Sequence, residues 1–268
     1  NRIRERITIE QALEVAIRRE EFVIYYQPRA DARTGELTGM EALIRWRHPE
    51  RGLLSPVEFI GVAEQTGLIV PIGEYVVRKV CAQIAAWRAQ NLPVKPVSVN
   101  VSALQLKGEG LRQTLIASLE RHQLSPRLIA FELTESSMLD EDGVAQSELR
   151  QLREMGIELE IDDFGTGYSS LSKLQSLDID VLKIDQSFVQ RLGKDAQAST
   201  LCETMVSVGR SLGISVVAEG VETEQQLQLL QRMGCDQIQG YLISTPMPAE
   251  DIPKLFGKVF FDPIAVNV

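Results

Sequence analysis

Side chains that carry carboxylate, amide or ammonium groups recur near the carboxyl ends of the strands that this sequence predicts. They are Asn100, Glu132, Asp162, Asp163, Lys183, Glu219 and Gln239, and Glu41 is a further acid that would point into the lumen of a barrel. Strands that alternate with helices form a parallel sheet or barrel, which gathers their carboxyl ends on one face. Several carboxylates brought together there are costly without cations. The pattern therefore predicts a site for a hard metal ion.

The available ligand types indicate which metal. The chain has only two histidines, His48 and His122, and neither ends a predicted strand. A cluster without histidine or cysteine fits zinc poorly and favours Mg²⁺ or Mn²⁺. The adjacent pair Asp162 and Asp163 suits two ions held about 3.5–4 Å apart with one bridging carboxylate. Such a pair of ions assists in-line displacement at a phosphoryl group.

Each of these residues also has a simpler structural interpretation. An acid at a strand end often caps the next helix, which would explain Glu219 before Gly220 and Asp185 before Ser187. Lys183 could order the attacking water or pair with Asp185 on the same strand face, and lysine chemistry alone does not separate these alternatives. Salt bridges to arginines would account for two of the acids but not for the set.

Composition restricts the class of partner. The chain has 268 residues, 44% of them hydrophobic, and a formal charge of −9. This charge argues against a nucleic-acid duplex or an anionic membrane as the main partner, while bound cations would still admit a small anionic substrate. Apolar runs are only strand-length, so no membrane segment is predicted. Three cysteines without paired spacing indicate reduced, buried thiols and a cytoplasmic location. Because Asn1 rather than Met opens the chain, we expect a fragment of a longer protein, which leaves membrane anchoring of the full protein open.

The elements that must position these side chains follow a regular order. A capping box at Thr8 predicts a helix to about residue 19, after a linker at 3–7. Strands 22–27 and 39–46 are joined too closely for a crossover helix and should be antiparallel neighbours. Further strands are expected at 97–101, 128–133, 157–163, 180–184, 214–219 and 237–242. Helices are expected at 57–66, 71–90, 109–122, 144–155, 169–176, 197–212, 223–233 and 249–256.

Eight strands in this order predict an α/β fold, a modified TIM (β/α)8 barrel. We expect residues 1–20 to form an N-terminal helix or linker from an upstream domain, 21–258 the barrel and 259–268 a tail. Strand alternation places Ser98 and Asn100 opposite the valines, in the barrel lumen. Asp162 has lumen phase and Asp163 does not. Asp163 can join the cluster only past the strand end, where Gly165 and Gly167 relax the backbone.

An ordered series of motifs links these residues. Glu41-Ala42-Leu43 is followed by Ile44-Arg45-Trp46. The other motifs are Tyr26-Gln27-Pro28, 56–68, 98–102, 131–135, 162–171, 182–185, 217–222 and Gln239-Gly240-Tyr241. Over roughly residues 20–250 the series resembles the EAL domain, a family of cyclic di-GMP phosphodiesterases. The resemblance implies a barrel with one antiparallel strand near its N-terminus and hydrolysis of cyclic di-GMP to linear pGpG with two Mg²⁺ or Mn²⁺ ions.

The resemblance also implies roles for individual residues. The first metal would be bound by Glu41, Asn100, Glu132 and Asp162, and the second by Asp162, Asp163 and Glu219. The catalytic side chains would be Lys183, beside the attacking water, with Asp163 and Glu219. Substrate contacts would come from Gln27, Leu43, Arg45 and Gln239. Support for the ligands would come from Glu135, Asp185 and Glu222. The loop 163–171 would connect the site to a dimer interface, which implies a homodimer.

Two positions depart from the family pattern. Arg29 stands where an aliphatic residue is more usual, and the closing segment 244–248 lacks the arginine that often precedes its first proline. The main alternative function is a silent domain that binds cyclic di-GMP as a sensor, but such domains tend to lose part of the ligand set, which is complete here. A generic Mg²⁺ barrel enzyme acting on a small carboxylate or phosphate ester is a third hypothesis, disfavoured by the motif series.

Overall fold

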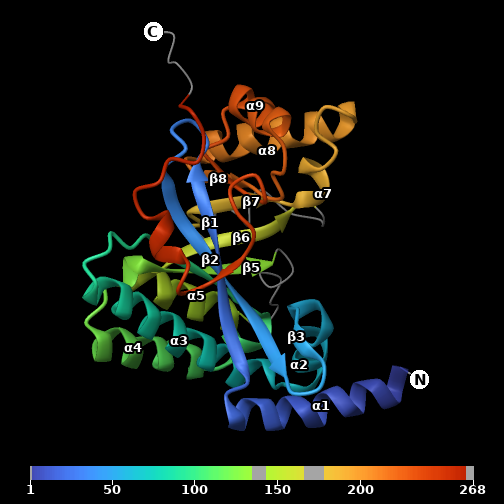
Figure 1. Cartoon of the computed structure of the whole chain (residues 1–268), viewed down its shortest axis with the longest axis vertical. Coiled ribbons are helices and arrows are strands. Elements are labelled where there is room, and N and C mark those ends of the chain that lie inside the picture. The colour runs from blue at the N-terminus through green and yellow to red at the C-terminus, as the bar shows by residue number, and fades with distance from the viewer. Residues whose placement is uncertain (1, 135–142, 166–177, 264–268) are drawn as a thin grey trace.

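The computed structural model describes residues 2–134, 143–165 and 178–263 (Figure 1). Its centre is a closed barrel of eight strands in the order β1-β9-β8-β7-β6-β5-β4-β2, with β2 pairing back onto β1. The short strands β10 and β3 extend the sheet beside β1 and β2. The predicted modified TIM barrel is confirmed.

The barrel strands are β1 Phe22–Asp31, β2 Leu37–His48, β4 Val97–Val101, β5 Ile129–Thr134, β6 Glu158–Phe164, β7 Val181–Ile184, β8 Ser215–Ala218 and β9 Gln237–Gln239, with β3 Gly52–Leu54 and β10 Met247–Pro248 outside it. The described α-helices are α1 Arg2–Arg19, α2 Ile60–Thr66, α3 Ile69–Ala89, α4 Gly110–His122, α5 Val144–Glu154, α7 Gln186–Val189, α8 Ala196–Leu212 and α9 Glu224–Met233. Short 3₁₀ turns are η1 Pro56–Glu58, η2 Ala103–Lys107, η3 Pro126–Leu128 and η5 Ile252–Leu255.

One strand of the barrel runs against the others. β1 is antiparallel to both β2 and β9, whereas β2 is parallel to β4 and each later neighbouring pair is parallel. The hairpin predicted from the short connection is therefore present, and its register places Gln27 opposite Glu41. Because β2 and the later strands are parallel, their carboxyl ends open on the same face, as the sequence argument required.

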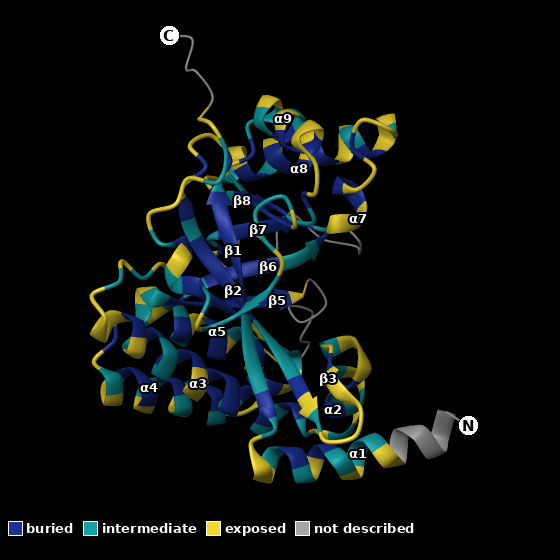
Figure 2. Cartoon of the chain, viewed as in Figure 1, coloured by how far each residue is buried: buried dark blue, intermediate teal, exposed yellow. Residues whose placement is uncertain are grey.

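The apolar face of the strands packs outward against the helices. Val97, Val99 and Val101 of β4 belong to the buried core, while Ser98 and Asn100 take the opposite face, as alternation predicts. Figure 2 shows the barrel strands as a largely buried centre surrounded by helices whose outer faces are exposed.

The outer ends of β1 and β2 carry a second apolar contact region. The ring of Phe22 lies 5.8 Å from that of Phe59 and 6.1 Å from that of Tyr75, and Trp46 lies 5.7 Å from Phe59. This aromatic group joins the hairpin to α2 and α3, and α1 runs beyond it (Figure 1). Leu13 of α1 is fully buried, so the N-terminal helix contributes to the core.

Several predicted boundaries were wrong. α1 begins at Arg2, so 3–7 is helical and Thr8 does not open the helix. The segment has neither proline nor glycine to stop a helix. The last predicted helix is only the turn η5, and β3 and β10 were missed. β9 ends at Gln239, earlier than predicted, and the next residue must be glycine, because a Cβ at Gly240 would lie 2.3 Å from the backbone of Val221. The helix predicted at 169–176 lies outside the described residues.

None of the helices in the described ranges combines the length and the apolar character that crossing a membrane requires.

Candidate active site

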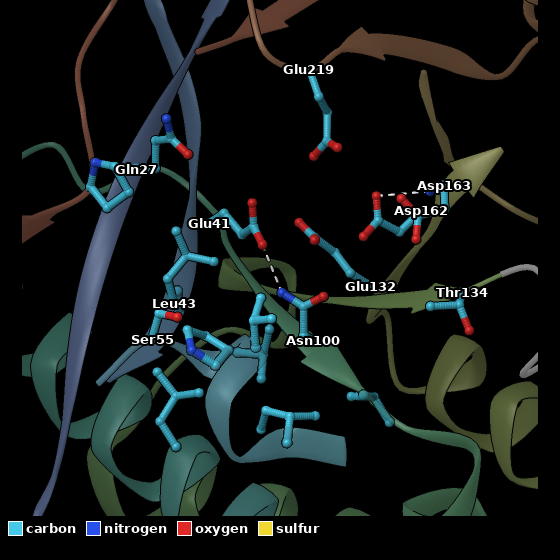
Figure 3. Close-up of a pocket in the computed structure, with 18 of the residues that line it drawn as sticks. Gln27, Glu41, Leu43, Ser55, Asn100, Glu132, Thr134, Asp162, Asp163 and Glu219 are labelled. Carbon is cyan, nitrogen blue, oxygen red and sulfur yellow. Dashed lines mark hydrogen bonds between the residues drawn. The ribbon is translucent and has the colours of Figure 1, made fainter. Parts of the chain in front are cut away.

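The predicted site residues that the structure describes line one cavity at the mouth of the barrel, except Lys183, which is buried beneath it. The cavity has a volume of about 960 Å³, and its lining includes Gln27, Glu41, Leu43, Arg45, Asn100, Glu132, Asp162, Asp163, Asp185, Glu219, Glu222 and Gln239. Figure 3 shows the carboxylates of Glu41, Glu132, Asp162 and Glu219 directed toward a common space from different strands or the residues that follow them. Glu135 lies outside the described residues.

Lys183 lies at the centre of this acidic group. Its Nζ is 2.7 Å from Glu132 Oε2 and 2.6 Å from Glu219 Oε1. Glu41 and Asp162 carboxylate oxygens follow at 3.6 and 3.7 Å. The lysine is fully buried, so its charge is compensated by these acids rather than by water. The alternative of a pair with Asp185 is wrong, because the side chain of Asp185 instead caps α7 by accepting from the backbone N–H of Ser187.

Glu41 is held in place through both of its oxygens. Asn100 Nδ2 donates to one oxygen at 2.7 Å, and Gln239 Nε2 donates to the other at 2.6 Å. Gln239 also donates to Gln27 Oε1 at 3.2 Å, and Gln27 Nε2 donates to the carbonyl oxygen of Ser244 at 3.1 Å. Side chains of β4 and β9 thereby fix the Glu41 carboxylate of β2 directly, and Gln27 of β1 holds Gln239 in place.

Asp163 reaches the cavity by a different route from the predicted one. It lies inside β6 rather than past the strand end. Its φ is +56°, and the pairing of β6 with β7 shifts register between Ile161 and Phe164. This bulge turns a residue of outward phase toward the lumen, beside Asp162, whose Oδ1 accepts from the Asp163 backbone N–H at 2.9 Å (Figure 3).

One ammonium among several acids leaves the carboxylates under-compensated. Burial, together with the charge of Glu41, raises the pKa of Glu132 well above its ordinary value. Burial is also the largest cause that raises the pKa of Glu219 to about 8, despite the attraction of Lys183. The pKa of Asp163 is raised to about 6 by burial and by Asp162. The neighbouring acids outweigh the burial of Lys183 and raise its pKa, so the lysine stays charged.

The donor set fits a hard divalent cation. The lining acids and Asn100 offer oxygen only, and Glu132 Oε1 is buried without a hydrogen-bond partner. A cation would lower the raised pKa values by replacing absent positive charge. In their present positions, no three histidine, cysteine, aspartate or glutamate side chains among the described residues form a group that could hold a metal ion.

Two lumen residues are not predicted by the motifs. Arg29 stands out in the sequence only as an unusual residue, and nothing in the motifs singles out Glu160. They form a buried ion pair at 2.7 Å below the acidic group. Strand alternation would have placed both side chains in the lumen, because Glu160 lies on the same strand face as Asp162 and Arg29 lies on the same face as Gln27. Their mutual pairing across the barrel could not be read from phase alone.

Comparison with known proteins shows which proteins the chain resembles in sequence. The sequence model of the EAL domain matches residues 10–246. The chain is 41% identical over 257 residues to the oxygen sensor protein DosP of Escherichia coli, covering 96% of this chain and 32% of that protein. It is 40% identical over 257 residues to the cyclic di-GMP phosphodiesterase PdeR of the same organism, covering 96% of this chain and 39% of that protein.

A solved structure of the PaMucR phosphodiesterase in complex with c-di-GMP has a TM-score of 0.87 and 42% sequence identity to the chain. The match covers 91% of this chain and 99% of that one. The chain itself spans only about a third of the length of DosP, the first of these relatives.

Proposed function

The chain belongs to the EAL domain family, and we propose that it is a metal-dependent phosphodiesterase that hydrolyses cyclic di-GMP to linear pGpG. The observation that carries the proposal is the complete set of oxygen ligands around one cavity, with a buried lysine among them. Two lines of comparison support the substrate, because PdeR is named a cyclic di-GMP phosphodiesterase and the PaMucR structure contains c-di-GMP.

We assign the metal ligands by position. Glu41, Asn100, Glu132 and Asp162 would hold one Mg²⁺ or Mn²⁺, and Asp162, Asp163 and Glu219 the other. Asp162 would bridge, which fits the adjacent placement of Asp162 and Asp163 on the bulged strand. When bound, the two ions would lower the pKa of water and neutralise charge on the phosphate.

The residues of the chain position the reactants. Lys183 is held between Glu132 and Glu219, where its ammonium would orient the attacking water and stabilise developing negative charge. Asp163 and Glu219 have raised pKa values, which suits groups that accept a proton from that water. Water attack on phosphorus would break the bond to the 3′ oxygen, leaving a 3′ hydroxyl and a 5′ phosphate.

Substrate contacts are assigned to the cavity wall opposite Asp163. Gln27 and Gln239 offer amide groups beside Glu41. Leu43 offers an apolar surface, and Arg45 is half-buried at the mouth, with its guanidinium 5.8 Å from the centre of the Tyr25 ring. An arginine at this place would neutralise phosphate charge that the net negative chain otherwise repels. Asp185 and Glu222 line the same cavity and would support the ligands and the loop after Asp163, as Glu135 would.

The chain would act inside the cell as one module of a larger protein. DosP is about three times as long as the matched segment, which supports the presence of further domains in the full protein, and we propose that one of them is a regulatory domain upstream. A homodimer joined near the segment after Asp163 would couple the site to regulation. Constant specific activity over a range of chain concentration that spans the measured monomer–dimer transition would argue against this coupling.

Hydrolysis is tested directly with the purified chain, cyclic di-GMP and Mg²⁺ or Mn²⁺, with chromatographic separation of pGpG. The matched controls are excess chelator and the variant Lys183→Met. We expect metal-dependent formation of pGpG by the parent and a large loss in the variant. Tight binding of cyclic di-GMP without any pGpG would instead identify a sensor domain.

A further inference from the structure

A second charged level lies in the barrel lumen beneath the acidic group. Arg29 of β1 donates from Nη1 to Glu160 Oε2 at 2.7 Å and from Nη2 to Glu160 Oε1 at 2.9 Å. Nη2 also donates to Ser98 Oγ at 2.5 Å, and Ser98 donates to Glu160 Oε1 at 2.8 Å. The Arg29 and Glu160 side chains are only 4% and 1% exposed, so this is a two-point ion pair fully inside the protein.

Small residues make room for this pair. Gly39 is the register partner of Arg29, and a Cβ at Gly39 would lie 3.2 Å from Arg29 Nη2. Ser98 pairs in register with Ala130, which is fully buried. TIM barrels usually fill this level with branched apolar side chains. Here three small residues admit one arginine that spans the lumen from β1 to β6.

The pair is adjacent to a proposed metal ligand. Glu132 and Glu160 are register partners on the parallel strands β5 and β6, and both are buried in the lumen. In addition to burial, the charge of Glu160 raises the pKa of Glu132, and a hydrogen bond between the two side chains lowers the pKa of Glu160. Glu132 therefore rests on Glu160, whose oxygens both accept from Arg29, while Glu132 Oε2 accepts from Lys183 Nζ at 2.7 Å.

Electrostatics agree with this geometry. Burial is the largest single influence on Glu160 and would raise its pKa, but Arg29, Lys183 and a hydrogen bond with Glu132 together lower the pKa below its ordinary value. The charges of Glu132 and Glu41 also act on Arg29. Arg29 Nε is buried without a hydrogen-bond partner, so the guanidinium is not fully satisfied by Glu160 and Ser98 alone.

We propose that Arg29 and Glu160 form a charged support that positions Glu132, so that the affinity of the site for its divalent cations depends on this pair. Arg29 and Glu160 are positioning residues, since they act through Glu132 and touch no reactant. The inference rests on the proposed function. The competing interpretation is that the pair fills the lumen as apolar residues would and has no effect on the metal site.

The test is Mn²⁺ affinity by titration calorimetry, because replacing a buried ion pair with apolar residues of similar size is often neutral for stability. The central variant is R29M/E160M, which removes both charges. The control is R112M/E148M, which removes another largely buried pair, at 3.0 Å between α4 and α5 and outside the lumen. Partners of metal ligands typically change affinity by about 10–100-fold.

We expect the Mn²⁺ dissociation constant to rise about 10-fold or more in R29M/E160M. The melting temperature should stay close to that of R112M/E148M, whose Mn²⁺ affinity should match the parent. R29K keeps the charge and should recover most of the affinity. Affinity in R29M/E160M within about twofold of the parent, or an equal loss in R112M/E148M, would overturn the proposal.

A second variant decides the matter if R29M/E160M does not fold. E160Q preserves the shape of the side chain and still accepts one hydrogen bond, but it leaves Arg29 as an uncompensated cation beside Glu132. We expect weaker Mn²⁺ binding, by about 10-fold. Mn²⁺ affinity in E160Q equal to that of the parent would refute the proposal that Arg29 and Glu160 position Glu132. Absence of Mn²⁺ binding or hydrolysis in the parent itself would instead refute the proposed function.

Discussion

Replacing Lys183 with methionine removes the cation that four buried or partly buried acids share. Its Nζ lies 2.6 Å from Glu219, 2.7 Å from Glu132, 3.6 Å from Glu41 and 3.7 Å from Asp162. Methionine has a similar length and keeps the lumen filled, so the change isolates the charge. We therefore expect Lys183→Met to lower the stability of the metal-free protein strongly.

The magnitude follows from the burial of the group. Removing one partner of a buried ion pair typically costs about 3–5 kcal/mol, because the remaining charge is left uncompensated. Lys183 and Glu132 are both 0% exposed, so little of this cost is relieved by water. For a chain of this size about 1 kcal/mol shifts Tm by roughly 2–4 °C, which gives a fall on the order of 10 °C.

The loss should grow with pH. Burial already raises the pKa of Glu219 to about 8 with the lysine present. Removing Lys183 takes away a charge that lowers this pKa, so the pKa of Glu219 rises further. The folded state then binds a proton that the unfolded state has released, so stability falls as pH rises from the ordinary glutamate pKa of 4.5 toward and above 8. Because the folded parent also holds this proton up to about pH 8, the difference between variant and parent should grow as pH rises through and above 8.

The assay is thermal unfolding in chelator at several pH values, with Lys79→Met as the matched control. Lys79 pairs with Glu20 at 2.9 Å but is 45% exposed, so its loss should cost no more than about 1 kcal/mol. Added Mn²⁺ should recover part of the stability of Lys183→Met, because the cation binds only the folded state. A Tm for Lys183→Met equal to that of Lys79→Met at pH 8 would refute the reasoning.

Three further predictions concern the same site. Glu41→Ala should lower turnover by about 100-fold and weaken Mn²⁺ binding, because it removes a proposed ligand and the acceptor that Asn100 and Gln239 share. The fold should survive, which circular dichroism checks, while calorimetry measures Mn²⁺ binding. Turnover equal to that of the parent would exclude Glu41 as a ligand. Mn²⁺ binding should weaken as pH falls from 8 through 6, because protons compete with the ion for Glu219 and Asp163. Calorimetry in two buffers of different ionisation heat should detect the protons that Mn²⁺ releases. A binding enthalpy that does not depend on the buffer would contradict this competition. Chelator should abolish hydrolysis, Mg²⁺ or Mn²⁺ should restore it, and Ca²⁺ should inhibit because it tolerates looser geometry; full activity in excess chelator would exclude a metal mechanism.

Strand order and alternation determined much of the molecule from the sequence alone. The short link between 22–27 and 39–46 required an antiparallel pair, which β1 and β2 form. The alternation in β4 placed Asn100 on the lumen face, and the same rule placed Glu132 and Asp162. These features are local, because backbone geometry fixes the face of each side chain within a strand. Convergence at one face then follows from parallel pairing.

Tertiary structure decided how these groups meet. Asp163 has the wrong phase and enters the cavity only because a bulge against β7 changes its direction. Lys183 pairs with Glu132 of β5 and with Glu219 after the neighbouring strand β8 rather than with Asp185, although Asp185 is nearest in sequence, because the first two side chains meet it inside the barrel. Arg29 finds Glu160 only in a closed barrel, where Gly39, Ser98 and Ala130 leave space. Such pairings depend on distances between strands that are far apart along the chain, and only packing in three dimensions sets those distances.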